Sequence, residues 1–69
     1  MSNVARVTEV IASSSQSFEH AVQVGIERAN KTLKNVQGAW IQSHKVECDE
    51  SGAIKEYRVI MKVTFILND

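Results

Sequence analysis

The only tryptophan of this 69-residue chain, Trp40, lies among polar residues in the stretch VQGAWIQSH, residues 36–44. An indole ring offers a large apolar face on which another planar ring can stack. If the stretch is extended, side-chain alternation places Gly38, Trp40, Gln42 and His44 on one face. The amide of Gln42 offers both a donor and an acceptor to the edge of a bound ring. The pattern predicts either a platform for a planar ligand or a contact between subunits, where tryptophan is also favoured.

Arg58 is the cation that a folded-back hairpin would bring close to this stretch. A three-residue loop would set two pairings between the strands, Trp40 with Lys62 and His44 with Arg58. The guanidinium could then donate to a carbonyl or a phosphate of a ligand. The alternative for Arg58 is an ion pair with Glu56 or Glu47.

No constellation for catalysis or for a metal centre accompanies these residues. His20 and His44 are isolated, and Cys48, the only cysteine, has no partner for a disulfide or a zinc site. We expect Cys48 to be a buried, small apolar residue. Asp49 and Glu50 supply too few oxygens for calcium unless several chains contribute, so we interpret them as turn residues. We therefore expect no enzymatic activity and no metal site.

The balance of charges argues against partners that are attracted by a strong electrostatic field. Eight basic and eight acidic residues give a formal net charge of zero, which favours neither nucleic acid nor an anionic membrane. No stretch of eighteen apolar residues occurs, and the first residues lack the pattern of a signal peptide. We expect a soluble, cytoplasmic protein, with which a free cysteine is compatible.

Four elements must position these residues. β-Branched residues predict a strand over residues 4–11 and two further strands over Val36–Cys48 and 53–67. Between the first two strands, a helical pattern covers residues 15–34. The turn residues of the segment 49–52 close a hairpin, with Gly52 able to adopt a positive φ.

The predicted helix carries one apolar stripe. Its members recur at steps of three or four: Phe18, Val22, Gly25, Ala29 and Leu33. Ser13 and Gln16 have the spacing of a capping box for its first turn. Gly25 costs about 1 kcal/mol of helix propensity, which indicates that the helix packs closely at this point.

The last strand has one apolar face and one mixed face. The apolar face carries Tyr57, Val59, Met61, Val63, Phe65 and Leu67. We expect this face to meet the helix in a single α+β domain, residues 1–69, with β-α-β-β order and the last strand in the middle of a three-stranded antiparallel sheet. The other face would expose Trp40, Ile60 and Ile66 in a monomer. A chain this short buries little surface alone, so we expect it to associate with copies of itself.

The chain resembles the dodecin family of small flavin-binding proteins. The resemblance rests on a strand followed by ASSSQSF, on the helix core AVQVGIERANKTLKNV, and on the final strand KEYRVIMKVTFIL. It implies a hollow homododecamer built from trimers, with no enzymatic activity, which stores or sequesters a flavin such as FMN, riboflavin or FAD. In the family, paired flavins stack between tryptophans of neighbouring subunits, and some members bind calcium or Coenzyme A.

Two residues depart from the flavin-binding pattern of that family. Gly38 stands where flavin-binding members have tryptophan, and Arg58 stands where they have glutamine. Trp40 is two residues further on, on the same face but about 7 Å along the strand. The resemblance implies a flavin site made of the following residues: Gln37, Gly38, Trp40, Gln42 and Arg58. The alternative is a structural oligomer that has lost flavin binding. In it, protein fills the Trp40 slot, the space beside the indole that a flavin would occupy, and the partner is another small ligand or calcium.

Overall fold

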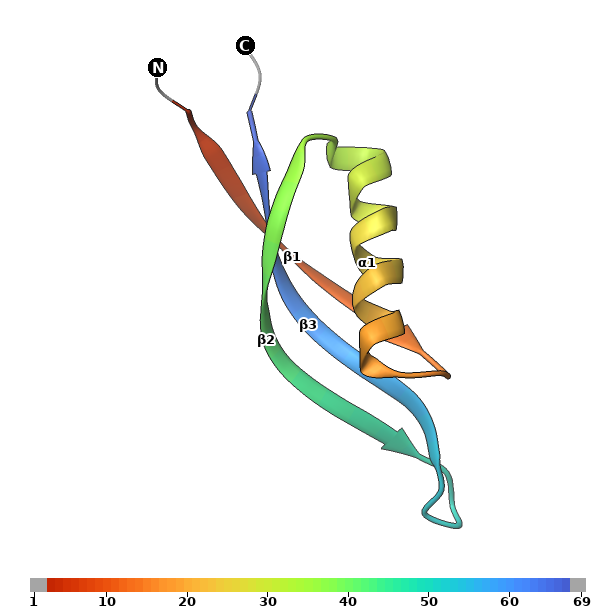
Figure 1. Cartoon of the computed structure of the whole chain (residues 1–69). Coiled ribbons are helices and arrows are strands. Elements are labelled where there is room, and N and C mark those ends of the chain that lie inside the picture. The colour runs from red at the N-terminus through yellow and green to blue at the C-terminus, as the bar shows by residue number, and fades with distance from the viewer. Residues whose placement is uncertain (1–2, 68–69) are drawn as a thin grey trace.

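The structure, a computed structural model, describes residues 3–67. Its elements, in chain order, are β1 (Ala5–Ser14), α1 (Phe18–Leu33), β2 (Val36–Cys48) and β3 (Ile54–Ile66). The expected β-α-β-β order is confirmed (Figure 1). The first strand is longer than predicted and the helix begins later, because β1 stays paired with β3 up to Ser14.

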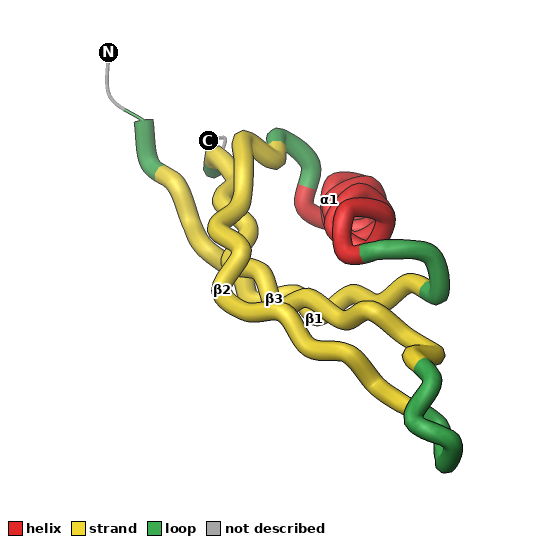
Figure 2. The backbone as a smooth tube through the Cα atoms, turned by 60° about the horizontal axis from the view of Figure 1, so that its bottom comes forward, coloured by secondary structure: helices red, strands yellow, loops and turns green. Residues whose placement is uncertain are grey.

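The sheet has the strand order β1-β3-β2, so β3 lies in the middle as predicted. β3 runs antiparallel to both neighbours, and α1 connects the two outer strands. Figure 2 shows that the sheet is strongly curved and that α1 lies on its concave side. The end of the β2–β3 hairpin extends past the helix (Figure 1), giving an elongated molecule of 54 × 19 × 14 Å.

The core lies between α1 and the middle of β3. Three side chains of β3 have no exposed surface: Val59, Met61 and Val63. Ala21, Gly25 and Ala29 are the buried residues of α1. A Cβ atom at Gly25 would lie 2.5 Å from Met61 Cε and 2.9 Å from Ala12 Cβ. The close approach inferred from Gly25 is therefore present, and Ala21 is a core residue that the predicted stripe missed.

The helix begins differently from the prediction. Ser17 is the N-cap, and its Oγ accepts a hydrogen bond from the backbone N–H of His20 at 2.9 Å. The predicted capping box of Ser13 and Gln16 is wrong because Ser13 is still in β1, paired with Arg58. Three residues separate strand and helix, and within them the N–H of Gln16 donates to Ser14 Oγ at 2.9 Å.

The hairpin turn between β2 and β3 is organised by Asp49. Its Oδ1 accepts hydrogen bonds from the N–H of Ser51 at 2.9 Å, from Ser51 Oγ at 2.7 Å and from the N–H of Ala53 at 3.1 Å. Gly52 has φ +85°, the left-handed conformation that the sequence predicted. Cys48 is exposed, so the expected burial is wrong; it ends a strand that has already passed the helix.

Candidate functional site

Trp40 lies on the convex side of the sheet, away from α1. It pairs with Lys62 of β3, as predicted. The neighbours of Lys62 along β3, Met61 and Val63, are buried under the helix, and alternation turns Lys62 and its partner Trp40 to the other side. Trp40 is 64% exposed. In a single chain, the largest side chain of the protein is thus presented to solvent.

The convex side, which we call the open face, is built from rows of residues that cross the three strands. In the order β1, β3, β2 the rows are Val7–Thr64–Gly38, Glu9–Lys62–Trp40, Ile11–Ile60–Ser43 and Ser13–Arg58–Lys45. Val7 and Ile11 are 49% and 62% exposed. The open face therefore carries exposed apolar side chains on β1, across β3 from Trp40, as well as charges.

Gly38 leaves a bare strip of backbone beside Trp40. The two residues lie on the same face of β2, about 7 Å apart. A Cβ atom at Gly38 would meet no other atom within 4 Å. The indole of Trp40 therefore has free space on the side of Gly38, into which a flat ring can extend.

A bulge in β2 separates Trp40 from His44. The register shifts between Ile41 and Ser43, so Gln42 has no directly paired residue on β3. His44 consequently pairs with Val59 and faces the helix, where its ring packs edge-on against Phe18 with centroids 4.8 Å apart. Counted from the loop, the predicted pairing of His44 with Arg58 is wrong because the register also shifts between Glu47 and Cys48, where Lys55 of β3 has no directly paired residue. A third shift, at Gln37, lies between Val36 and Gly38.

Arg58 lies two rows from Trp40 and is engaged by carboxylates. It pairs with Lys45 across the strands and lies four residues from Lys62, about 13 Å along β3. Its guanidinium is 3.0 Å from Glu56 Oε1 and 3.9 Å from Glu47 Oε2. The ion-pair alternative for Arg58 is thus what the single chain shows.

Glu47 is held by two cations at this end of the open face. Lys45 Nζ lies 3.1 Å from Glu47 Oε2. The hydrogen bond from Lys45, together with the charges of Lys45 and Arg58, lowers the pKa of the Glu47 carboxyl below its usual value. Glu47 is therefore ionised at neutral pH, and the cations Lys45 and Arg58 already have a carboxylate partner.

The structure therefore brings together part of the predicted site. Gly38 and Trp40 lie side by side on the open face, Gln37 and Gln42 lie at the two bulges that flank them, and Arg58 is distant within the same chain. The prediction missed Val7, Glu9 and Ile11, whose alternation within the first strand was a usable signal. The bulges could not be read from alternation alone.

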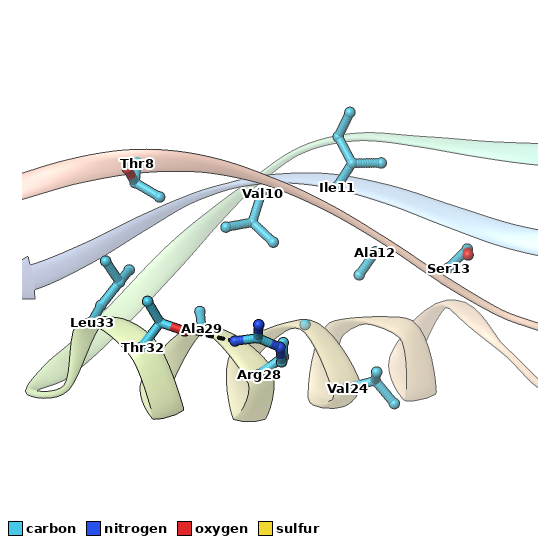
Figure 3. A pocket seen from close by; sticks show the side chains of 11 residues that line it. Thr8, Val10, Ile11, Ala12, Ser13, Val24, Arg28, Ala29, Thr32 and Leu33 are labelled. Carbon is cyan, nitrogen blue, oxygen red and sulfur yellow. Dashed lines mark hydrogen bonds between the residues drawn. The ribbon is translucent and has the colours of Figure 1, made fainter.

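A separate cavity of about 380 Å³ lies on the concave side, between α1 and β1. Apolar side chains of both elements line it, among them Val10, Ala12, Val24, Ala29 and Leu33 (Figure 3). At its rim, Arg28 donates to Thr32 Oγ1 at 2.6 Å. The cavity lies beside the unpaired edge of β1, and none of the predicted flavin-site residues lines it.

Other site classes find no support in the described part of the chain. Within residues 3–67, no three His, Cys, Asp or Glu side chains are grouped so that they could hold a metal ion. Over the same residues, no helix has the length and apolar character needed to span a membrane.

Comparison with known proteins decides the family. The family model described as Dodecin matches residues 4–68. The chain belongs to the dodecin family. The dodecin of Thermus thermophilus is 30% identical over 69 residues, covering 100% of this chain and 99% of that protein.

Solved dodecin structures share the fold along the chain. The dodecin from Streptomyces davaonensis has a TM-score of 0.95 at 29% identity, with 100% of both chains covered. A Mycobacterium tuberculosis protein described as a calcium dodecin with a novel calcium-binding site has a TM-score of 0.82 at 26% identity, covering 94% of this chain and 91% of its own. Dodecins are small flavin-binding proteins that self-associate, and a hollow dodecamer is the assembly known for the family.

Proposed function

We propose that this chain forms a hollow, cytoplasmic homododecamer, built from trimers, that binds flavin without transforming it. Its role is then to store or sequester free FMN, riboflavin or FAD. The proposal treats residues 1–69 as one dodecin domain, of which the family model matches 4–68. The assembly offers a physical advantage to so short a chain, because it covers apolar surface that a single copy exposes.

The observation that carries the proposal is the exposed Trp40 beside the bare backbone of Gly38. In a dodecin fold, Trp40 offers a stacking face to a planar ring and Gly38 leaves the space beside it open. A tricyclic flavin has a large, flat face of the same character. The apolar surroundings on β1, Val7 and Ile11, add contact area for a ring or for a second subunit.

The remaining site residues take secondary roles in this proposal. Gln37 and Gln42 lie at the bulges on either side of Trp40 and can offer amide hydrogen bonds to the ring edge. Arg58 reaches a flavin only if it exchanges its carboxylate partners, Glu56 and Glu47, for the ligand. We therefore place Trp40 and Gly38 at the centre of the site and Arg58 at its margin.

Fluorescence titration tests the proposal directly. Adding the purified protein to riboflavin, FMN or FAD should quench the flavin emission, because a stacked indole deactivates the excited ring. Trp40→Leu should abolish quenching while keeping the apolar bulk, and Val24→Ser, on the opposite side of the sheet, should leave it unchanged. Unchanged emission of all three flavins at micromolar wild-type protein would refute flavin binding.

The second candidate is an oligomer that has lost flavin binding, in which protein fills the Trp40 slot and another small ligand or calcium is bound. It is favoured by one observation: Arg58, at the position of the family glutamine, is held by Glu56 and Glu47. This candidate predicts a colourless dodecamer that dissociates when Trp40 is replaced by alanine. Sedimentation velocity separates the two, since under the first proposal the Trp40→Ala assembly persists and only the flavin is lost.

A further inference from the structure

We propose that Lys62 makes the Trp40 site selective for flavins that carry a phosphate, and that Glu9 sets the limit of this selectivity. The inference rests on the proposed function, since it assigns a ligand preference to the same site. It concerns the central row of the open face, in which Lys62 stands between Glu9 and Trp40.

The position of Lys62 relative to Trp40 is fixed by the sheet. The two residues are directly paired across β3 and β2, so their Cβ atoms are about 5 Å apart on the same face. Lys62 is exposed, like Trp40. A ligand stacked on the indole therefore has an ammonium group beside it, on a flexible stem that can follow a phosphate.

Among residues 3–67, Lys62 differs from the other cations of the open face in having no carboxylate partner at ion-pair distance. Lys45 and Arg58 both lie within 4.0 Å of Glu47, and Arg58 also pairs with Glu56. Across residues 3–67, the ion pairs of the chain involve those four residues and leave Lys62 out. The cation nearest to Trp40 in register is thus the one that remains available to an anion.

Glu9 is the acidic neighbour that opposes this effect. It pairs with Lys62 from the β1 side of the row, which places Trp40 and Glu9 on opposite sides of the lysine. A phosphate near Lys62 therefore gains attraction from the ammonium and is repelled, from further away, by the carboxylate. Removing the charge of Lys62 should lower the affinity for phosphorylated ligands, and removing the charge of Glu9 should raise it.

The expected effect is small and measurable. Riboflavin and FMN share the same ring system and differ by the phosphate, which adds between one and two negative charges at neutral pH. An exposed ion pair strengthens binding by about twofold to fivefold. We expect the wild-type protein to bind FMN more tightly than riboflavin by that factor at low salt, and the ratio to approach one at about 0.5 M salt.

The experiment compares the affinity ratio of FMN to riboflavin in four assembled proteins. Wild type should show a ratio of about two to five, Lys62→Gln a ratio near one, and Glu9→Gln a ratio above that of wild type. Lys45→Gln is the matched control, since Lys45 is a lysine of the same face that already pairs with Glu47. It should keep the wild-type ratio. Apparent mass and circular dichroism verify that each variant is assembled.

The outcomes separate this inference from the proposed function. If wild type binds both flavins equally and Lys62→Gln changes nothing, the selectivity is refuted while flavin binding stands. If Lys45→Gln lowers the ratio as much as Lys62→Gln does, general surface charge accounts for the preference and the assignment to Lys62 is refuted. If neither flavin binds wild type, the proposed function is refuted and the inference falls with it.

Discussion

Replacing Gly25 by alanine should destabilise the protein, although alanine is the better helix former. The change places a methyl group 2.5 Å from Met61 Cε and 2.9 Å from Ala12 Cβ. Carbon atoms in contact prefer about 3.5–4.0 Å, so the helix and β1 must separate by roughly 0.6–1.1 Å or distort. Met61 has no exposed surface, and its terminal methyl therefore has little room to turn away.

The magnitude follows from two opposing contributions. Overpacking of this kind costs about 1–3 kcal/mol, and the helix propensity of alanine recovers about 1 kcal/mol. Because Ala12 Cβ is attached to the backbone of β1 and cannot rotate away, we expect the cost to lie near its upper end. The net loss should be about 1–2 kcal/mol of unfolding free energy, or roughly 5–15 °C in Tm for a chain of this size.

Thermal and denaturant unfolding, followed by circular dichroism at one subunit concentration, measures this loss. The concentration must be matched because association shifts apparent stability. Gly38→Ala is the control: a Cβ atom there meets nothing within 4 Å, so its effect should stay within about 0.5 kcal/mol. Adding Ala12→Gly to Gly25→Ala should recover part of the loss. A Gly25→Ala protein that melts above wild type would refute the close-packing argument.

Three further predictions concern the ends of the elements. Ser17→Ala should lower the unfolding free energy, measured with denaturant, by about 1 kcal/mol because the N–H of His20 loses its cap. Ser17→Asp should keep most of the wild-type stability, because a carboxylate can also accept this hydrogen bond. Phe18→Ala should cost about 2–4 kcal/mol, since its ring packs against His44 and, at 5.2 Å, against Tyr57; Phe18→Leu should lose less. The hydrogen bond from Ser51 Oγ, with those from the backbone, lowers the pKa of Asp49 below its usual 3.8. The ionised carboxylate therefore contributes its full share of the unfolding free energy above pH 3.8. This contribution is lost as the pH falls through the lower pKa that Asp49 has in the folded protein. Asp49→Asn should be less stable than wild type at neutral pH, and this difference in unfolding free energy should shrink on acidification. A difference that stays constant down to about pH 2 would contradict this.

The order and pairing of the elements could be predicted because they depend on local patterns. The apolar face of β3 and the turn chemistry near Gly52 identify a hairpin. A three-residue loop predicted the pairing of Trp40 with Lys62, which the structure has because the register shifts at Lys55 and at Gln42 offset each other. The stripe on the helix indicated which face of β3 it covers. These features follow from side-chain periodicity, which one sequence displays.

The details that failed depend on contacts between distant segments. The helix start was misplaced because Ser13 and Gln16 have the spacing of a capping box, and only the pairing of β1 with β3 keeps Ser13 in the strand. His44 was assigned to the wrong side because an extra residue at Gln42 is indistinguishable from regular alternation. Within one chain, Gly38 and Trp40 are therefore neighbours and Arg58 lies two rows away, while the flavin-binding role of all three stays a prediction.

The bulge at Gln42 gives β2 two independently registered halves. Upstream, residues 38–41 present the indole to the convex side; downstream, residues 43–47 direct His44 inward to the aromatic rings under the helix. In an uninterrupted ladder, a single inserted residue would invert every later side chain. Here the insertion is absorbed where it occurs. The half of β2 that carries the indole and the half that contacts the helix can thus differ in length by a residue without turning each other over.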